Sequence, residues 1–307
     1  MKKQQKEEIC GLGDLKNWRK TKPPIRLAVI GDPVAHSLSP EMQNAALREA
    51  GLEMQYARFQ ISPDELKEAL ILIRDRDFVG VNLTLPHKVY VSQFLDAIDD
   101  EAKESGAVNT VAVRDGKLIG FNTDGIGLSR AIREQFSVDL RDLRVLILGA
   151  GGAARAIALQ CAREGCERLV IVNRTAEKAQ SLARALQNYF SGPRVLGPVA
   201  RLQTIAWEEA ALRFQIANSD LIVNATPLGL NHPDLSPIPA RLLAPHLMVY
   251  DTVYLRGDSR TALVAAATEA GARAADGLSM LLHQGARAFE IWFGRSAPID
   301  VMRQALL

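Results

Sequence analysis

Short apolar runs alternate with segments of helical periodicity along the chain from residue 25 onward. The apolar runs predict strands at residues 25–30, 56–60, 79–84, 143–148, 169–172, 221–224 and 248–250. The segments between them predict helices at 40–50, from 63, from 86, and at 126–136, 153–164, 176–189, 261–270 and 279–293. Strands that alternate with helices pair in parallel through crossover connections, so the pattern predicts an α/β fold.

The alternation starts again after Gly125, in a chain of 307 residues that is about twice the length of a typical domain. We therefore expect two α/β domains joined near residues 125–130. Hydrophobic residues make up 48% of the chain and charged residues 23%, which excludes a disordered protein. The uninterrupted apolar runs are far shorter than the roughly 18 residues of a membrane helix, so we expect no membrane insertion.

Basic residues gather at the start of the chain. Residues 1–24 contain seven Lys or Arg and three Asp or Glu, so the rest is slightly acidic although the formal net charge is +2. A nucleic-acid-binding body would be far more basic, so we expect no nucleic-acid partner. We interpret residues 1–24 as a basic, solvated N-terminal extension, because they lack the apolar core of a signal peptide.

The three cysteines and five histidines have no metal-ligand spacing, so we expect no metal site. An odd, small number of cysteines also excludes a secreted protein built on disulfides, and it favours the reducing cytoplasm. The sequence leaves open whether the protein is a monomer or a homodimer.

A glycine-rich turn joins the strand at 143–148 to the helix that follows. Its residues Gly149-Ala150-Gly151-Gly152-Ala153-Ala154 match G-x-G-x-x-A between a strand and a helix, the context that this motif requires. The first glycine permits the tight turn, the second lets the backbone approach a pyrophosphate, and Ala154 lets the helix pack closely. Free amides at the helix start would hold the pyrophosphate. We predict a dinucleotide site here.

The end of the next strand indicates which dinucleotide binds. NAD sites usually have an acidic residue there for the ribose 2′-hydroxyl, whereas an arginine suits the 2′-phosphate of NADP. Here the strand is followed by Asn173, Arg174 and Thr175, without an Asp or Glu. The planar guanidinium of Arg174 suits a phosphate, so we predict NADP rather than NAD.

Two serines follow the first strand of the first half. Ser39 before Pro40 has the character of a helix N-cap with proline at the first helical position. A plain cap does not need Ser37. Two hydroxyls beside free helix amides form a natural seat for a carboxylate.

Asn82, Thr84 and Lys88 lie at the end of the strand at 79–84. Alternation along the strand places Asn82 and Thr84 on one face. A helix that starts at Pro86 would place Lys88 in its first turn, where the positive end of the helix dipole disfavours a charged ammonium. Such a lysine suits a general acid or base near neutral pH, although a solvated surface lysine fits the same position.

Asn109 and Asp124 lie in two further polar clusters, at residues 106–110 and 120–125. An amide and a carboxylate could bind vicinal hydroxyls of a substrate. A carboxylate beside Lys88 would also orient the lysine and tune it. On spacing alone, the cluster around Asp124 is equally an ordinary turn.

The order of these motifs resembles that of the shikimate dehydrogenase family. The resemblance rests on His36-Ser-Leu-Ser39-Pro, Asn82-x-Thr-x-Pro-x-Lys88, Ala107-Val-Asn109-Thr, Asn122-Thr-Asp124-Gly, Gly149-Ala-Gly-Gly-Ala, Asn173-Arg-Thr and Asp276-Gly-Leu, and it extends over residues 25–307. Each motif alone is weak, but the joint order is specific. The family reduces 3-dehydroshikimate to shikimate with NADPH in aromatic amino-acid biosynthesis, and the resemblance implies the same oxidoreductase activity here.

The resemblance also implies a domain layout. Residues 25–127 would form a substrate-binding catalytic domain, completed by residues 277–307, whose C-terminal helix returns to it. Residues 128–276 would form a Rossmann-type NADP-binding domain.

The family's functional residues map onto this sequence one by one. Ser37, Ser39 and Thr84 would hold the substrate carboxylate. Lys88 and Asp124 would form the catalytic pair, in which Lys88 donates the proton to the carbonyl oxygen during reduction. The other implied substrate contacts are Asn109, Tyr254 and Gln284, and the implied cofactor contacts are Gly149, Ala150, Gly151, Gly152, Ala153, Asn173, Arg174, Thr175, Thr252, Gly277 and Asp100.

The sequence departs from the family pattern in two places. Ser279 stands where many relatives have glycine, and the segment 254–261 lacks the usual proline and is longer, as loops tolerate. Two alternatives remain: a quinate/shikimate dehydrogenase that uses NAD or both cofactors, and a non-catalytic regulator on the same fold. The regulator should have lost Lys88 or Asp124, and both are present.

Overall fold

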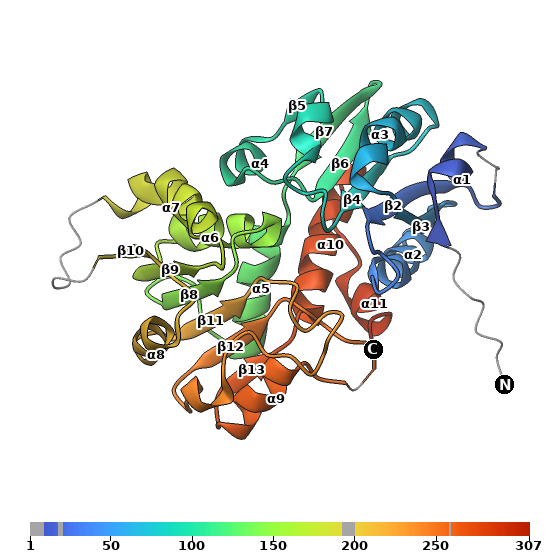
Figure 1. The fold of residues 1–307 in the computed structure, drawn as a ribbon. Helices are drawn as coiled ribbons and strands as arrows, with labels where there is room; N and C mark the ends of the chain where they lie inside the picture. Colours follow the sequence, from blue (N-terminus) through green and yellow to red (C-terminus); the bar gives the residue numbers. More distant parts are fainter. Residues whose placement is uncertain (1–8, 18–20, 192–199, 258) are drawn as a thin grey trace. The chain divides into compact units, whose positions relative to one another are not determined.

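The computed structural model describes residues 9–17, 21–191, 200–257 and 259–307 (Figure 1). The chain divides into two compact units. Unit 1 contains the chain up to Thr123 together with Gly285–Leu307, and unit 2 contains Asp124–Gln284. The predicted domain breaks are 127/128 and 276/277, whereas the units divide at 123/124, where α5 begins, and at 284/285, within α10.

Unit 1 is built on a seven-stranded sheet of mixed direction. Its strands are β1 (Ile9–Cys10), β2 (Ile25–Gly31), β3 (Gln55–Gln60), β4 (Gly80–Leu83), β5 (Ala97–Ile98), β6 (Thr110–Arg114) and β7 (Lys117–Phe121). Their order is β1-β3-β2-β4-β6-β7-β5. The predicted parallel pairing is correct for β2, β3 and β4, but β6 is antiparallel to both of its neighbours.

The β6–β7 hairpin is one of several elements that the apolar pattern did not predict. Asp115 and Gly116 join its strands, and both have positive φ, 51° and 69°. An Asp-Gly pair between two strands is the usual sequence signal for such a turn. Because β6 runs against β4, the start of β6 and the end of β7 lie at the same edge of the sheet as the end of β4.

Helices cover both faces of the unit 1 sheet. The core on one face is closed by α1 (Leu12–Lys16), the short 3₁₀ helix η1 (Pro63–Glu65) with α3 (Leu66–Asp75), and α4 (Asp100–Ser105). The other face carries α2 (Ser39–Glu49), α11 (Ile299–Gln304) and the second half of α10 (Leu278–Phe293). Trp292 of α10 donates its Nε1–H to the carbonyl of Val111 at 3.0 Å, which confirms the expected return of the C-terminal helix to the first domain.

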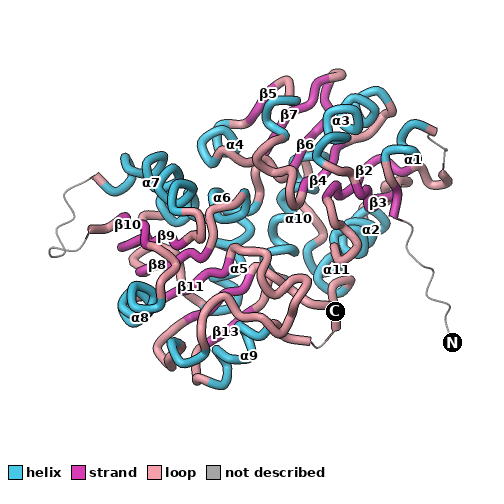
Figure 2. Tube along the Cα trace, viewed as in Figure 1, coloured by secondary structure: helices cyan, strands magenta, loops and turns pink. Residues whose placement is uncertain are grey.

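Unit 2 is a doubly wound parallel sheet (Figure 2). Its strands are β8 (Arg144–Leu148), β9 (Arg168–Val172), β10 (Leu202–Ile205), β11 (Leu221–Asn224), β12 (Met248–Asp251) and β13 (Arg273–Ala275). Its helices are α5 (Asp124–Phe136), α6 (Gly152–Arg163), α7 (Ala176–Phe190), α8 (Glu209–Ala217), the 3₁₀ helix η3 (Ala240–Leu242), α9 (Ala262–Glu269) and the first half of α10. The strand order is β10-β9-β8-β11-β12-β13, and every neighbouring pair is parallel.

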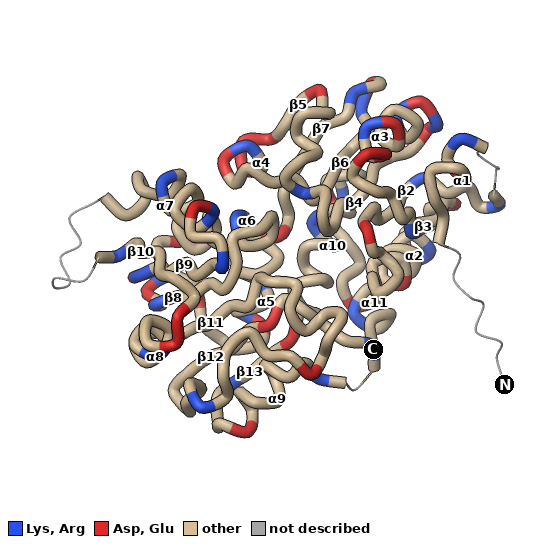
Figure 3. Tube along the Cα trace, viewed as in Figure 1, with Lys and Arg blue, Asp and Glu red and all other residues tan. Residues whose placement is uncertain are grey.

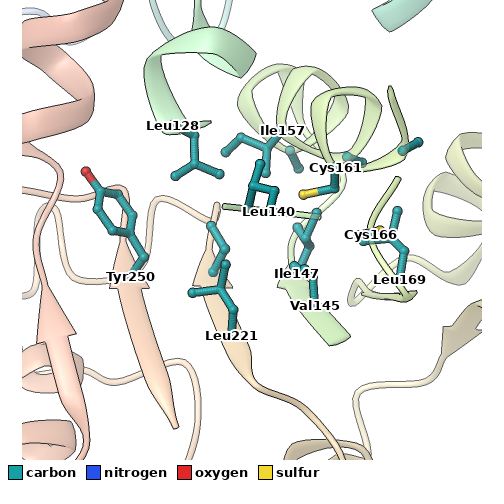
Figure 4. Packing of buried hydrophobic residues seen from close by; sticks show 14 of the residues in the cluster. Leu128, Leu140, Val145, Ile147, Ile157, Cys161, Cys166, Leu169, Leu221 and Tyr250 are labelled. Carbon is teal, nitrogen blue, oxygen red and sulfur yellow. The ribbon is translucent and has the colours of Figure 1, made fainter. Parts of the chain in front are cut away.

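Alternate residues of the central strands enter two different cores. Val145 and Ile147 of β8 pack under α5, α6 and α7, and Figure 4 shows this core with Leu128 and Ile157 on its helical side. Leu146 and Leu148 enter the core that α8 and α9 cover. A strand that is buried on both faces has an unbroken apolar run, which explains why its position could be predicted so closely.

The prediction of a solvated N-terminal extension is wrong for residues 9–16. The strand β1 pairs in parallel with β3, with Ile9 opposite Arg58. The helix α1 then packs against α3, and its Leu15 is completely buried. Lys16 also forms an ion pair with Glu68 at 2.9 Å. Residues 1–8 lie outside the described part of the chain.

Lys and Arg are interspersed with Asp and Glu along the described parts of both units (Figure 3). Within the described residues, the search for helices long and apolar enough to cross a bilayer finds none.

The packing of α1 predicts that its apolar side chains contribute to stability. We expect Leu15→Ala to lower the free energy of unfolding by about 2–5 kcal/mol, because it opens a cavity in a buried core. Urea unfolding of the full chain measures the change. Ile9→Ala is the matched control, since Ile9 is 41% exposed and should have a much smaller effect. Equal, small effects of both substitutions would mean that α1 is not part of the folded unit.

Candidate active site

Ser37 and Ser39 lie where the chain leaves β2 and enters α2. The helix begins at Ser39 with Leu38 as its N-cap, so the prediction of Ser39 as the N-cap is wrong. The hydroxyl of Ser37 accepts the backbone N–H of Ser39 at 3.3 Å, so it takes over part of the capping role. Both serines are about 5% exposed, and two hydroxyls therefore lie at the amino end of α2.

Thr84 directly follows β4, at the same edge of the sheet. Its backbone N–H binds the carbonyl of Ile30 at 2.9 Å, and the next carbonyl, that of Leu85, accepts the N–H of Asp32. A Cβ on Gly31 would lie 2.4 Å from the Thr84 methyl group, so the ends of β2 and β4 approach closely. This contact brings Thr84 close to the segment that leads to the two serines.

The predicted helix from Pro86 does not form. Residues 85–90 are turns, and only a short 3₁₀ helix, η2 (Val91–Phe94), follows. The dipole argument for Lys88 therefore does not hold. Instead, His87 is buried and its Nε2 lies 2.8 Å from the carbonyl of Ile61. Burial lowers the pKa of His87 below its usual value, and the bond to Ile61 only partly offsets this.

Lys88 is half-buried, and its backbone connects it to the next polar cluster. Its carbonyl accepts the N–H of Val108 at 2.8 Å, which places the Lys88 backbone beside Asn109. The N–H of Asn109 in turn binds the carbonyl of Phe121 at the end of β7.

The Asn109 side chain holds the residue that precedes Asp124. Its Nδ2 donates to Thr123 Oγ1 at 2.9 Å, and its Oδ1 accepts the Thr123 N–H at 2.8 Å. Asn109 and Thr123 are both buried, and Asp124 follows as the first residue of α5. Thr123 was not among the predicted site residues, although it is the middle residue of the Asn122–Asp124 motif.

A second set of buried hydrogen bonds, centred on Asn82, supports this edge of the sheet. Asn82 accepts the hydroxyl of Tyr56 at 2.7 Å and donates to the carbonyl of Asn109 and to Thr110 Oγ1. Thr110 donates back to Asn109 Oδ1 at 3.0 Å. Neither Tyr56 nor Thr110 was among the predicted site residues; for Tyr56 the reason is that its partner Asn82 is 26 residues away in the sequence.

The glycine turn of unit 2 has the backbone that the motif requires. Gly149 has φ +115°, and a Cβ there would lie 2.8 Å from the carbonyl oxygen of Ala225. Gly151 is the exposed N-cap of α6, and a Cβ on it would meet no atom within 4 Å. Ala154 lies in the first turn of α6 and is fully buried. The first backbone N–H groups of α6 have no acceptor within the helix, so the glycine turn suits the binding of a pyrophosphate.

Asn173, Arg174 and Thr175 connect β9 to α7, where Thr175 is the N-cap. Asn173 Nδ2 binds the carbonyl of Thr175 at 2.9 Å, which shapes the turn. Arg174 is exposed at its tip. A guanidinium at this strand end, with no acidic residue among the three, fits a 2′-phosphate better than a free 2′-hydroxyl.

Thr252 and Gly277 approach each other closely in unit 2. A Cβ on Gly277 would lie 2.2 Å from the carbonyl oxygen of Thr252, so only glycine fits there. The Gly277 N–H binds the carbonyl of Val253 at 3.2 Å. These two predicted cofactor residues therefore lie side by side at the start of α10.

Gln284 and Tyr254 occupy other parts of unit 2, and Asp100 lies in unit 1. Gln284 is buried on α10, where its backbone and Cβ leave space only for glycine at position 127 of α5. Tyr254 is half-buried in the loop after β12. Asp100 is the exposed first residue of α4, next to the edge strand β5. Ser279, which stands where many relatives have glycine, has a partner in the structure: its hydroxyl lies 2.9 Å from that of buried Tyr250.

Asp251 is a buried carboxylate that the sequence did not identify. It ends β12 and is completely buried, and it accepts hydrogen bonds from Thr261 Oγ1 at 2.7 Å, Asn224 Nδ2 at 2.8 Å and the N–H of Val253 at 3.0 Å. Burial raises its pKa to about 6, because these neutral donors only partly offset the desolvation. Asp251 thus fastens the loop that carries Thr252 and Tyr254.

The strand order of unit 2, with its glycine turn after the first strand, defines a dinucleotide-binding domain of the Rossmann type. Unit 1 adds a second α/β sheet with a polar edge. The class is that of a two-unit, dinucleotide-binding α/β protein.

Comparisons with known proteins identify the family. Residues 29–111 match the shikimate dehydrogenase substrate binding domain, 130–204 match shikimate / quinate 5-dehydrogenase, and 277–307 match the shikimate 5'-dehydrogenase C-terminal domain. The chain belongs to the shikimate dehydrogenase family, which confirms the resemblance predicted from its motifs.

Individual relatives agree over almost the whole chain. The chain is 42% identical to a shikimate dehydrogenase (NADP(+)) of Methanopyrus kandleri, over 92% of this chain and 94% of that protein. It is 43% identical to one of Symbiobacterium thermophilum, over 92% and 93%. A Thermus thermophilus shikimate 5-dehydrogenase structure in complex with NADP(H) and shikimate has a TM-score of 0.79 and 37% identity, over 92% of this chain and 98% of that one.

The raised pKa of Asp251 predicts a pH-dependent stability. Between about pH 4 and pH 6 the native protein binds the Asp251 proton more tightly than the unfolded chain does, so this group's contribution to stability falls as the pH rises. Asp251→Asn removes that loss. We expect its free energy of unfolding, relative to the parent, to rise by about 3 kcal/mol over this range.

Urea unfolding of both proteins between pH 4 and 7 measures the difference. Asp220→Asn is the matched control, because the bonds from Arg144 lower the pKa of Asp220 despite its partial burial. Because the lowered pKa of Asp220 places its titration below this range, that variant should differ from the parent by a nearly constant amount between pH 4 and 7. A constant difference for Asp251→Asn would show that its carboxyl titrates normally.

Proposed function

We propose that this chain catalyses the reversible, NADP-dependent reduction of 3-dehydroshikimate to shikimate, in aromatic amino-acid biosynthesis. The proposal rests on two facts together: the chain belongs to the shikimate dehydrogenase family, and the unit 1 sheet has a polar edge. This edge places two serine hydroxyls, a threonine, a lysine and an asparagine around the ends of β2 and β4 and the start of β6. A hydroxylated carboxylic acid needs such an anion seat, several hydrogen-bonding groups and one group that transfers a proton.

Ser37, Ser39 and Thr84 are the proposed seat of the substrate carboxylate. Backbone bonds join Thr84 to the end of β2, and the Ser37 hydroxyl is held by the N–H of Ser39, which supports a preorganised seat. The amino end of α2 adds favourable electrostatics for an anion.

Lys88 is the proposed proton donor, from Nζ to the substrate carbonyl oxygen during reduction, and the acceptor in the reverse direction. Asp124 is proposed to orient Lys88 and to bind a ring hydroxyl together with Asn109. Support comes from the backbone: Val108 binds the Lys88 carbonyl, and Asn109 holds Thr123. Tyr254 and Gln284 complete the proposed substrate contacts.

NADP is proposed to bind along Gly149–Ala153 and at Asn173–Thr175, with Thr252, Gly277 and Asp100 as further contacts. The open amides of the glycine turn suit the pyrophosphate, and Arg174 suits the 2′-phosphate. When bound, NADPH supplies the hydride, and the protein supplies position and the proton.

The cytoplasm is the proposed location. Cys10, Cys161 and Cys166 are free thiols, and burial raises the pKa of Cys166 to about 12, which keeps that thiol protonated. Reduced cysteines are the rule in that compartment.

Turnover measurements with shikimate and quinate, each with NADP and NAD, test the proposal. We expect shikimate with NADP to be the most efficient of the four pairs by kcat/KM. Arg174→Ala should then raise the KM for NADP far more than the KM for NAD, because only NADP carries the 2′-phosphate. Faster turnover of quinate with NAD would contradict both the proposed substrate and the proposed cofactor. If Arg174→Ala raised the KM for NADP and for NAD equally, Arg174 would not bind the 2′-phosphate.

The proposed role of Lys88 predicts a loss of turnover without a matching loss of binding. We expect Lys88→Ala to lower kcat by about 100-fold or more, the usual scale of general acid–base catalysis. Lys103→Ala is the matched control, since Lys103 is an exposed lysine on α4 of the same unit. Near-normal turnover of Lys88→Ala would assign the proton transfer to another group.

A further inference from the structure

Arg58 is a buried arginine in the middle of a strand. It lies on β3 with 4% exposure, on the face opposite to its neighbour Phe59, which enters the core under α3. Charged side chains are almost never fully buried unless they are paired, because desolvation of the charge is costly. The partners of Arg58 therefore indicate what the buried charge is for.

Its guanidinium converges on the serine segment. Nε and one terminal nitrogen of Arg58 both donate to the carbonyl of Ser37, at 3.0 and 2.6 Å. The same terminal nitrogen donates to Glu41 Oε2 in the first turn of α2 at 2.6 Å. The planar guanidinium thus binds the backbone just before α2 and the side chain of Glu41 in the first turn of that helix.

These contacts act on the hydroxyls of the serine pair. The carbonyl that Arg58 binds belongs to Ser37, whose hydroxyl also accepts the N–H of Ser39. Held in this way, the carbonyl oxygen is turned to the guanidinium and is not available to repel a ligand carboxylate. The charge of Arg58 adds a positive potential next to the serines, which Glu41 partly cancels.

We propose that Arg58 is a positioning residue for the carboxylate seat, which fixes the Ser37–Ser39 segment and supplies a buried positive charge next to it. The proposal rests on the proposed function, because it assumes that these serines bind the substrate carboxylate. A lysine cannot replace the guanidinium, since an ammonium does not bind a carbonyl and a carboxylate in one plane.

The test compares shikimate with its methyl ester, which has the same ring but no carboxylate charge. We expect Arg58→Lys to lower the ratio of kcat/KM for shikimate to that for the ester by about tenfold, mainly through the KM for shikimate. The KM for NADP should not change. Arg168→Lys is the matched control, a buried arginine of unit 2 that binds Gln203 and Gln215, and its ratio should equal that of the parent.

A second variant tests the electrostatic part and remains informative if Arg58→Lys does not fold. Glu41→Gln keeps an oxygen that can accept from Arg58 but removes the negative charge, so it should raise the ratio several-fold. If Arg58 had a purely structural role, each variant would lower kcat/KM for shikimate and for the ester equally. The ratio would then not fall in Arg58→Lys and rise in Glu41→Gln.

The proposal is overturned if Arg58→Lys folds and keeps the parent ratio. It is equally overturned if Glu41→Gln leaves the ratio unchanged or lowers it. A failure of the proposed function would be seen earlier and separately, as a parent protein that does not turn over shikimate with NADP.

Discussion

The hydrogen bonds between Asn109 and Thr123 hold the polar edge of unit 1 together. Asn109 precedes β6 and Thr123 follows β7, so they meet only because the β6–β7 hairpin returns to the edge where β4 ends. Both side chains are buried, and Thr110 joins them by donating to Asn109 Oδ1 at 3.0 Å, so the pair belongs to a buried polar cluster in which each hydrogen bond contributes about 0.5–1.5 kcal/mol. The backbones of Lys88 and Asp124 are both attached to this pair. The hairpin therefore serves the chemistry of the edge as well as the core.

The sequence predicted unit 2 better than unit 1, for a physical reason. The strands β8, β9, β11 and β12 are buried on both faces, so each is an unbroken apolar run whose limits show directly in the sequence. The edge strand β10 is only half-buried throughout, and β13 has three residues, so neither has a clear pattern. The prediction for residues 9–16 is wrong because Leu12 and Leu15 anchor this segment in the core despite the charges around them.

The candidate site divides along the same line between local and distant contacts. The glycine turn and the start of α2 could be predicted to within a residue, because a turn or a helix start depends on its own neighbours in the chain. The helix expected from Pro86 is absent because distant bonds take precedence over a local signal, with Leu85 bound to Asp32 and His87 to Ile61. Supports such as Arg58, whose partner is 21 residues away, leave no trace in local spacing.

In each unit a buried charged side chain binds a segment that carries proposed site residues. In unit 1 the guanidinium of Arg58 binds a carbonyl and the carboxylate of Glu41, so its charge is partly compensated at short range. In unit 2 the carboxylate of Asp251 has the neutral donors Thr261, Asn224 and the backbone of Val253, which offset its burial only in part. The two residues differ in position, because Arg58 lies within β3 and binds the segment between β2 and α2, whereas Asp251 ends β12 and binds the loop that follows it. The pKa of Asp251 is about 6, so its charge, and with it the support of the loop after β12, changes with pH in that range.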